Sequence, residues 1–172
     1  MMKTLSDSLP ITTFNLVTFA SNFLQLTKFR LAISVVFSSV AGYLLAEDQI
    51  EISILLGLFF GGFAMVGASN AFNQWIEKDK DALMDRTKNR PLPAGRMNNL
   101  TALTIASLLA LTGIYILNNI NFKTALFGSL SIFIYIFIYT PLKSLTPLSV
   151  FVGAFPGAIP FMLGWVAATG SF

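Results

Sequence analysis

The side chains best suited to chemistry recur every four residues near the middle of the chain: Asn73, Glu77 and Asp81. On a helix, each four-residue step turns by about 400°, so the three side chains share one face. Acids at this spacing repel one another, and the repulsion grows where water is partly excluded. Magnesium binds such oxygen ligands, usually one or two carboxylates completed by water and substrate phosphate. The spacing therefore predicts a positive partner against this face, either a lysine or a divalent cation.

Basic and helix-ending residues follow this row directly. The basic residues are Arg86, Lys88, Arg90 and Arg96, and the helix-ending residues are Pro91, Pro93 and Gly95. A guanidinium group matches two phosphate oxygens at once. Carboxylates for a metal followed by arginines for phosphate would bind a magnesium diphosphate. Multi-pass membrane proteins commonly have charged, solvated loops of similar composition, so the residues alone leave both interpretations open.

A second polar pair, Tyr139 and Lys143, lies in the sequence YTPLK at the end of an apolar stretch. The stretch returns to the membrane face that carries the acidic row. A lone lysine at such a position commonly sets orientation, and a tyrosine commonly anchors the interface. Spacing alone therefore indicates no ligand here.

The composition excludes most other classes of protein. Of 172 residues, 55% are apolar and only 11% are charged, and the mean hydropathy is +0.72. Soluble domains carry about 25% charged residues, so a soluble enzyme, a nucleic-acid-binding module and a disordered chain are excluded. There is no Cys or His, which leaves carboxylates, amides, phenols and cations for any chemistry.

Charge-free intervals predict the elements that must position these residues. A membrane-spanning helix needs about 20 mostly apolar residues. Five intervals qualify, near 28–46, 52–75, 100–118, 124–141 and 147–168. The predicted fold is thus an all-helical, multi-pass membrane bundle.

The basic residues predict the orientation of this bundle. All of them except Lys123 lie on one side if the N-terminus is cytoplasmic, as the positive-inside rule requires. The acidic row and its arginines then lie on the cytoplasmic side. Residues 1–27 resemble neither a secretory signal nor a transit peptide, and 13–27 form an expected interfacial helix. These features favour a bacterial plasma (inner) membrane.

Glycine and proline predict how two of the spans pack. Gly57 and Gly61, followed by Gly62 and Gly67, suit a close approach of the second span to a neighbouring helix. Pro156 and Pro160 predict a kinked or partly unwound fifth span. Such a helix either lines a cavity or carries a simple proline kink.

Residues 73–95 resemble the first aspartate-rich motif of the UbiA-type intramembrane prenyltransferases. The matching pattern is N-x-x-x-E-x-x-x-D followed by R-T-x-N-R-P-L-P-x-G, which is specific to this superfamily. Two longer segments, FNQWIEKDKDALMDRTKNRPLPAGR and YTPLKSLTPLSVFVGAFPGAIPFMLGW, and the sequence LTKFRL resemble the haem branch of the family. The resemblance runs from about residue 25 to the end, which implies that residues 28–172 are the N-terminal part of a transmembrane prenyltransferase domain, after a cytoplasmic segment, 1–27.

The resemblance implies a membrane fold of about nine spans around a central cavity, of which five are present here. Two aspartate-rich motifs would bind farnesyl diphosphate through Mg²⁺. The allylic C–O bond would ionise, and a vinyl group of protoheme IX would attack the carbocation to give haem O. The implied partners, besides the lipid bilayer, are haem-pathway or oxidase-assembly proteins.

The resemblance also assigns roles by position. The implied metal ligands are Asn73, Glu77 and Asp81. The implied diphosphate-binding residues are Asn73, Arg86, Arg90 and Lys143. The implied catalytic residues are Asp81, Tyr139 and Lys143, of which Lys143 would pair with diphosphate and Tyr139 would face the developing cation.

Two departures from the family pattern stand out. Glu77 occupies a position that is more often aspartate, but its charge is the same and its reach is longer. No Asp or Glu follows Asp85, so the second aspartate-rich motif is missing. We therefore expect the chain to be the N-terminal part of a longer enzyme, without transferase activity by itself.

Two alternative functions remain at this stage. The first is a prenyltransferase of the same superfamily that acts on an aromatic or quinone precursor. The second is a membrane transporter or assembly protein without chemistry, which the glycine pattern and the proline-containing span also suit. The transporter hypothesis predicts that Asp81→Asn leaves ligand binding intact, whereas the transferase hypothesis predicts loss of magnesium-dependent diphosphate binding.

Overall fold

The computed structural model describes residues 15–171. Helices make up most of this range, and no strand occurs within it. The elements are α1 (Leu16–Leu26), α2 (Phe29–Ala46), α3 (Ile52–Ala82), α4 (Asn99–Ile120), α5 (Phe122–Phe133), the π-helix η1 (Ile134–Tyr139), α6 (Thr140–Leu142) and α7 (Ser149–Thr169). The predicted all-helical fold is confirmed.

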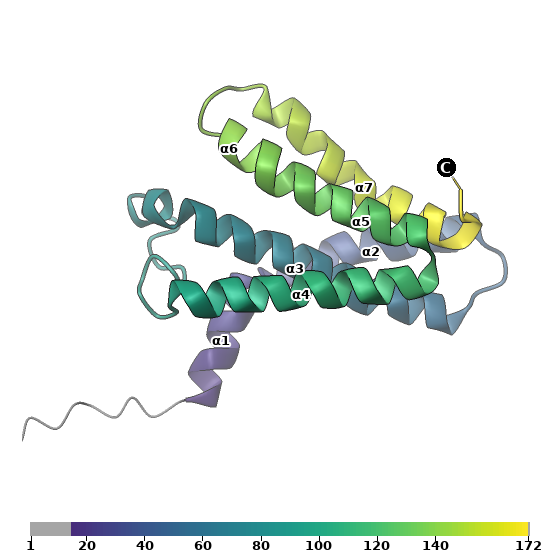
Figure 1. Cartoon of the computed structure of the whole chain (residues 1–172), viewed down its shortest axis with the longest axis horizontal. Helices are drawn as coiled ribbons and strands as arrows, with labels where there is room; N and C mark the ends of the chain where they lie inside the picture. The colour runs from purple at the N-terminus through teal and green to yellow at the C-terminus, as the bar shows by residue number, and fades with distance from the viewer. Residues whose placement is uncertain (1–14, 172) are drawn as a thin grey trace, which may run out of the picture.

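The long helices form one bundle with its loops at two ends (Figure 1). Helix α3 packs along α4, and α2 packs along α7, with α5 between the two pairs. The α3–α4 and α6–α7 connections lie at one end, which we call the polar end. The α2–α3 and α4–α5 connections and the C-terminus lie at the other (Figure 1).

Five helical segments of the described chain are long and apolar enough to cross a membrane, as the charge-free intervals predicted. Their bounds are Phe29–Ala46, Ile52–Ala82, Asn99–Ile120, Phe122–Leu142 and Ser149–Thr169. The second is longer than its predicted range, 52–75, because the helix continues through the charged residues. The predicted interfacial helix corresponds to α1, and residues 13 and 14 of its predicted range lie outside the described residues.

Close approach between helices depends on glycine, as the pattern in the second span predicted. A Cβ atom added at Gly57 would lie 2.9 Å from the Ile120 side chain, and one at Gly61 would lie 2.9 Å from Leu117. The approach of α2 to α7 is closer still. A Cβ at Gly164 would overlap the Ser39 carbonyl, which is backbone and has no rotamer to adopt.

Two segments depart from regular or expected helical geometry. Pro156 and Pro160 lie inside α7, which remains continuously helical, so of the two predicted alternatives, a kinked or a partly unwound span, the second does not occur. Each proline lacks the backbone N–H that would donate within the helix, and a membrane bundle allows this because neighbouring helices can supply other partners for the freed carbonyl groups. The π-helical turn η1 was not predicted, because its sequence, IYIFIY, carries no signal that distinguishes it from an ordinary apolar helix.

Candidate active site

The acidic row forms one buried face on the last turns of α3. Asn73, Glu77 and Asp81 retain 2%, 6% and 2% of their accessible surface. All three lie within α3, which confirms the predicted helical spacing. Buried carboxylates require charged or hydrogen-bonding partners, because desolvation of an unpaired charge is expensive.

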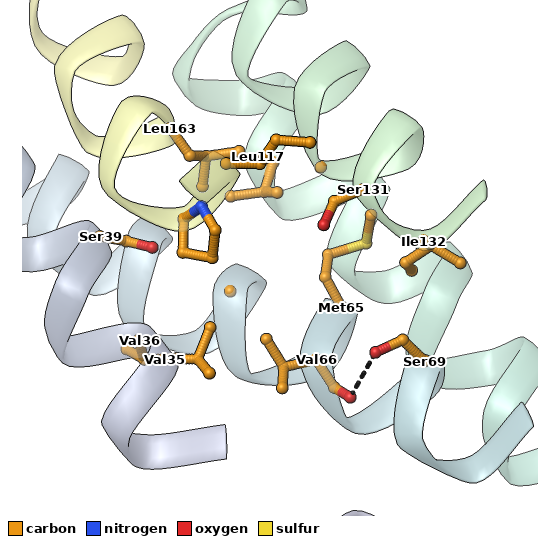
Figure 2. A pocket seen from close by; sticks show the side chains of 14 residues that line it. Val35, Val36, Ser39, Met65, Val66, Ser69, Leu117, Ser131, Ile132 and Leu163 are labelled. Carbon is orange, nitrogen blue, oxygen red and sulfur yellow. Dashed lines mark hydrogen bonds between the residues drawn. The ribbon is translucent and has the colours of Figure 1, made fainter. Parts of the chain in front are cut away.

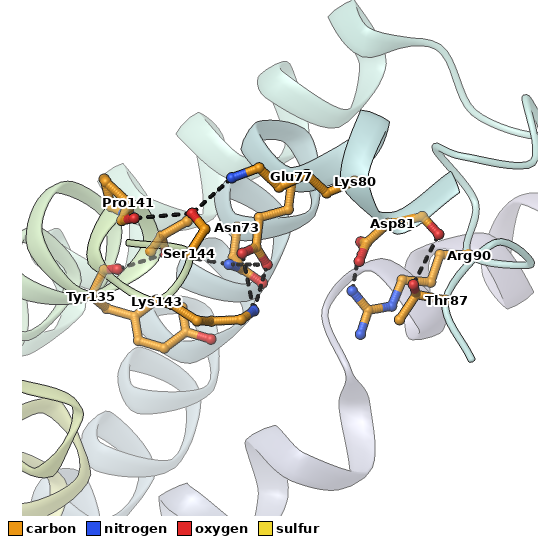
Figure 3. Close-up of polar contacts among 11 residues, drawn as sticks. Asn73, Glu77, Lys80, Asp81, Thr87, Arg90, Tyr135, Pro141, Lys143 and Ser144 are labelled. Carbon is orange, nitrogen blue, oxygen red and sulfur yellow. Dashed lines mark hydrogen bonds and ion pairs between the residues drawn. The ribbon is translucent and has the colours of Figure 1, made fainter. Parts of the chain in front are cut away.

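Glu77 obtains its partners from a distant part of the sequence (Figure 3). Lys143 Nζ donates to both Glu77 carboxylate oxygens, at 3.0 and 2.9 Å. Asn73 Nδ2 donates to Glu77 Oε2 at 3.0 Å and to Thr140 Oγ1 at 3.2 Å. The structure therefore brings the predicted residues Asn73, Glu77 and Lys143 into one contact.

Asp81 obtains its partner from the loop that follows α3. Arg90 Nη1 donates to Asp81 Oδ2 at 2.6 Å, and the Asp81 side chain is 3% exposed. The buried Thr87 hydroxyl donates to the Asp81 carbonyl oxygen at 2.9 Å, which folds the loop back against the helix end (Figure 3). Arg90, which the resemblance assigns to the diphosphate, therefore pairs with the acidic row in this structure.

Two other charged residues of this loop lie apart from the cluster. Helix α3 ends at Ala82, so the acidic row does not reach Asp85, which instead pairs with Lys88 in an exposed contact. Arg86, predicted to bind phosphate, is exposed and makes no hydrogen bond or ion pair with any described residue. The prediction for Arg86 thus has no support from the geometry.

Sequence reasoning overlooked Lys28, which it treated only as a basic residue beside the first span. Lys28 precedes α2 and is half-buried at the polar end. Burial, followed by the charges of Arg90 and Lys143, lowers the pKa of Lys28 to about 8, against the opposing effects of Glu77 and Asp81. The signal available in the sequence was its place in LTKFRL, but its distance from the acidic row concealed the connection.

Tyr139, which directly precedes the Thr140 that contacts Asn73, lines a cavity of about 390 Å³. Its ring stacks on Tyr135 at 5.2 Å between centroids, and both rings line the cavity. Pro156 and Pro160 of α7 line the same cavity, which fits the first of the two alternatives that the sequence left for this helix. The remaining walls come from α2, α3 and α5.

A smaller, mostly apolar cavity of about 50 Å³ lies deeper in the bundle (Figure 2). It shares Val35, Val66, Ser69, Ser131 and Pro160 with the first cavity. Met65, Leu117 and Leu163 line the smaller cavity among its apolar residues. The two cavities adjoin, so the polar cluster lies above a largely apolar space.

The donor set suits a magnesium ion held largely by a ligand's phosphate groups. No three Asp, Glu, His or Cys residues converge on one point within residues 15–171. Two hard oxygen donors, Glu77 and Asp81, do lie one helical turn apart. Arg90 bonds to only one oxygen of Asp81. One or two carboxylates completed by phosphate and water is the usual environment of magnesium at a diphosphate.

Comparison with known proteins identifies the class to which this fold and site belong. The sequence profile of the UbiA prenyltransferase family matches residues 35–172. The chain therefore belongs to the UbiA prenyltransferase family, as its aspartate-rich motif indicated. Together with the five spans, membership makes it a multi-pass membrane protein.

Its similar relatives include proteins named protoheme IX farnesyltransferase. The one from Christiangramia forsetii is 67% identical over 152 residues, which are 88% of this chain and 51% of the relative. The one from Flavobacterium johnsoniae is 64% identical over 154 residues, with the same two coverages. The chain thus spans about half the length of the curated relatives it matches.

Solved structures confirm the fold. A digeranylgeranylglyceryl phosphate synthase superposes with a TM-score of 0.81 at 21% identity, covering 87% of this chain and 53% of that one. A UbiA homologue from Archaeoglobus fulgidus, bound to DMAPP and Mg²⁺, superposes with a TM-score of 0.76 at 18% identity. It is covered to 55%, and this chain to 88%.

Proposed function

We propose that this chain forms the donor-binding part of an enzyme that transfers a farnesyl group from farnesyl diphosphate to a vinyl group of protoheme IX, giving haem O. The observation that carries the proposal is the cluster of two buried carboxylates and two cations, Glu77 with Lys143 and Asp81 with Arg90, above an apolar cavity. A molecule with a charged diphosphate head and an apolar tail is complementary to both parts. The names of the similar relatives supply the acceptor.

In this proposal, the cations of the cluster bind the diphosphate. Lys143 and Arg90 would turn from their carboxylate partners toward phosphate oxygens, while Glu77 and Asp81, with Asn73 beside them, would hold magnesium. Magnesium, when bound, would neutralise charge on the departing diphosphate. As the allylic C–O bond breaks, its electron pair leaves with the diphosphate, and Lys143 stabilises the charge that accumulates there.

The cavity would receive the farnesyl chain and shield the cation. Tyr139 lines its wall close to the cluster, so its ring would face the allylic carbon as positive charge develops there. An aromatic face stabilises a nearby cation, and more strongly where water is excluded. The vinyl group of protoheme IX would then supply the electrons of the new C–C bond, and a water molecule would add to the cation left on the vinyl carbon and lose a proton.

The orientation that suits this chemistry places the polar end in the cytoplasm of a bacterial cell, at the inner membrane. The basic residues of the α3–α4 loop and Lys143 gather at this end, as the positive-inside rule requires. Because the chain has no Cys, an introduced Asn89→Cys or Ser171→Cys would report the side of the membrane by thiol labelling. We expect labelling of position 89 only from the cytoplasmic side.

Magnesium-dependent binding of farnesyl thiodiphosphate, an analogue that resists ionisation, tests the donor site directly. We expect binding by the 172-residue chain in detergent and a loss of about tenfold or more with Asp81→Asn, because a charge-assisted contact is removed. Asp85→Asn is the matched control, since this exposed carboxylate lies four residues further along, in the loop after α3 and outside the cluster. Equal affinities for the two variants would overturn the proposed site.

The acceptor requires a separate measurement on a protein that has the full length of the relatives and includes this chain. We expect haem O from farnesyl diphosphate, protoheme IX and Mg²⁺, and none from the 172-residue chain alone. Prenylation of 4-hydroxybenzoate or a quinone precursor instead would keep the donor site and replace the acceptor. Haem O formation by the 172-residue chain would contradict the proposed division of the activity.

A further inference from the structure

The turn between α1 and α2 has an unusual backbone conformation. Lys28 has φ 50° and ψ 56°, and within residues 15–171 it is the only residue other than glycine with a positive φ. Residues other than glycine rarely adopt this left-handed backbone conformation. They keep it where surrounding contacts impose it, often at functional sites. The contacts that impose it here are specific and buried.

Two amide side chains of α3 hold the turn. Gln74 Nε2 donates to the Gln25 and Leu26 carbonyl oxygens, both at 2.9 Å, and Asn70 Nδ2 donates to the Thr27 carbonyl oxygen at 3.1 Å. Gln25 and Leu26 are the last residues of α1 and Thr27 is its C-cap, where carbonyl groups lack helical partners. The Gln25 carbonyl also accepts from the Lys28 amide at 3.4 Å. Gln74 and Asn70 are 0% and 2% exposed, so the bonds lie away from competing water.

The same helix therefore carries both the carboxylates and the residues that fix the turn. Asn70 lies three residues before Asn73, a little less than one helical turn, and Gln74 is the next residue after Asn73. The turn that carries Lys28 is thus bonded to the helix that carries Glu77 and Asp81. The charges of Glu77, Asp81, Arg90 and Lys143 act on Lys28, although 49 to 115 residues separate it from them in the sequence.

Lys28 leaves the cluster with more positive than negative charge. Glu77 is paired with Lys143 and Asp81 with Arg90, whereas Lys28 forms no ion pair with any described residue. A half-buried ammonium group among these charges has lost hydration without gaining a carboxylate. An anion in the cluster would supply that missing partner, and the net charge favours one.

We propose that Lys28 is a third diphosphate-binding cation and that Gln74 and Asn70 are positioning residues that hold it at the donor site. This inference rests on the proposed function of the cluster. It connects the interfacial helix α1 to donor binding, because the carbonyl groups at the end of α1 accept hydrogen bonds from an amide side chain of α3. It also explains why a buried glutamine and asparagine face a helix end here.

The test measures the affinity of the 172-residue chain in detergent for farnesyl thiodiphosphate with Mg²⁺. We expect Lys28→Met to weaken binding about tenfold or more, since a charge-assisted phosphate contact is lost, and Lys28→Arg to restore most of it. Arg30→Met is the matched control, because it removes the same charge from an exposed residue two positions away. Its affinity should remain within about twofold of the unmodified chain's.

A double-mutant cycle tests the positioning role. Gln74→Met should weaken binding in the unmodified chain and add nothing in Lys28→Met, because it acts through Lys28. Where Gln74→Met does not fold, Asn70→Leu replaces it in the same cycle. Equal effects of the positioning variant in both backgrounds would overturn that role.

The outcomes separate this inference from the function on which it rests. Absence of binding by the unmodified chain would overturn the proposed donor site as well. Loss with Asp81→Asn but affinities for Lys28→Met and Arg30→Met that match the unmodified chain's would overturn the role of Lys28 alone. A lower unfolding temperature for Lys28→Met with unchanged affinity would likewise make the turn structural only.

Discussion

The interior of the bundle and its polar end achieve burial by opposite means. In the interior, helices approach because side chains are absent, as at Gly61 against Leu117 and at Gly164 against the backbone of α2. At the polar end, the helix is buried because charged side chains meet partners, as Glu77 does with Lys143. The difference teaches that packing in the interior depends on the size of the side chains, whereas burial at the polar end depends on the pairing of charged side chains.

The largest effect expected from breaking this comparison is in the interior. Gly164→Ala places a methyl group on the Ser39 carbonyl and the Tyr43 amide nitrogen, so α2 and α7 must separate. Overpacking of this kind costs about 3 kcal/mol. Gly157→Ala is the control on the same helix, because its Cβ would meet nothing within 4 Å. Thermal unfolding in detergent measures both, and similar unfolding temperatures would contradict the packing argument.

A somewhat smaller loss is expected at the polar end from Arg90→Met. It leaves the Asp81 carboxylate buried without its partner, which should lower the free energy of unfolding by about 2 kcal/mol. The loss is smaller than for a fully buried ion pair because the Arg90 side chain is itself partly exposed. Lys88→Met removes the partner of the exposed Asp85 and should cost nothing measurable. Adding Asp81→Asn to Arg90→Met should recover part of the stability. Chemical unfolding of the four chains tests this, and no recovery would argue against an unpaired charge as the cause.

The pH dependence of stability sharpens the comparison, since among residues 15–171 only the polar end contains a strongly perturbed cation. The pKa of Lys28 is about 8 in the folded chain, against its ordinary value of 10.5 in the unfolded chain, so the unfolded chain binds more protons between these limits. Stability should therefore rise with pH above about 8, by on the order of 1 kcal/mol by pH 9.5. The facing charges are Glu77, Asp81, Arg90 and Lys143. Unfolding of the unmodified chain and Lys28→Met at pH 7.5 and 9.5 measures it, and equal pH slopes would contradict the prediction.

The smallest effect is expected from Thr140→Val, which keeps the shape and removes a hydroxyl. Thr140 Oγ1 accepts from Asn73 and donates to the Tyr135 carbonyl at 2.8 Å. Asn73 retains its bond to Glu77, so the loss should be about 0.5 kcal/mol. Thr140→Ser, which keeps the hydroxyl, is the control in the same unfolding measurement. A larger loss for Ser than for Val would show that the methyl group matters more.

The two regions also differ in how well the sequence predicted them. The spans and their glycine contacts follow from hydropathy and from spacing within one helix, so 28–46 and 147–168 agree closely with Phe29–Ala46 and Ser149–Thr169. The face shared by Asn73, Glu77 and Asp81 was predictable for the same reason. These features depend on neighbours a few residues apart.

The partners at the polar end could not be predicted from spacing, because they come from other elements. The contact of Lys143 with Glu77 depends on how α6 meets α3, and the position of Lys28 depends on buried amides of α3. Family resemblance supplied Lys143 and Arg90, but it also supplied Arg86, which lies outside the cluster. Helix α3 ends at Ala82, and the loop geometry beyond it separates the two arginines.

The π-helical turn η1 has a consequence for how this span tolerates changes in length. Each residue of an α-helix advances the side chains by about 100°, and the wider turn at Ile134–Tyr139 absorbs one residue more than an α-helical turn does. A one-residue deletion there would leave hydropathy and membrane crossing nearly unchanged. Because the turn holds that extra residue, the deletion would return it to regular α-helix and keep Thr140 and Lys143 facing Asn73 and Glu77. The same deletion in the regular helix α5 would turn both residues by about 100° away from their partners.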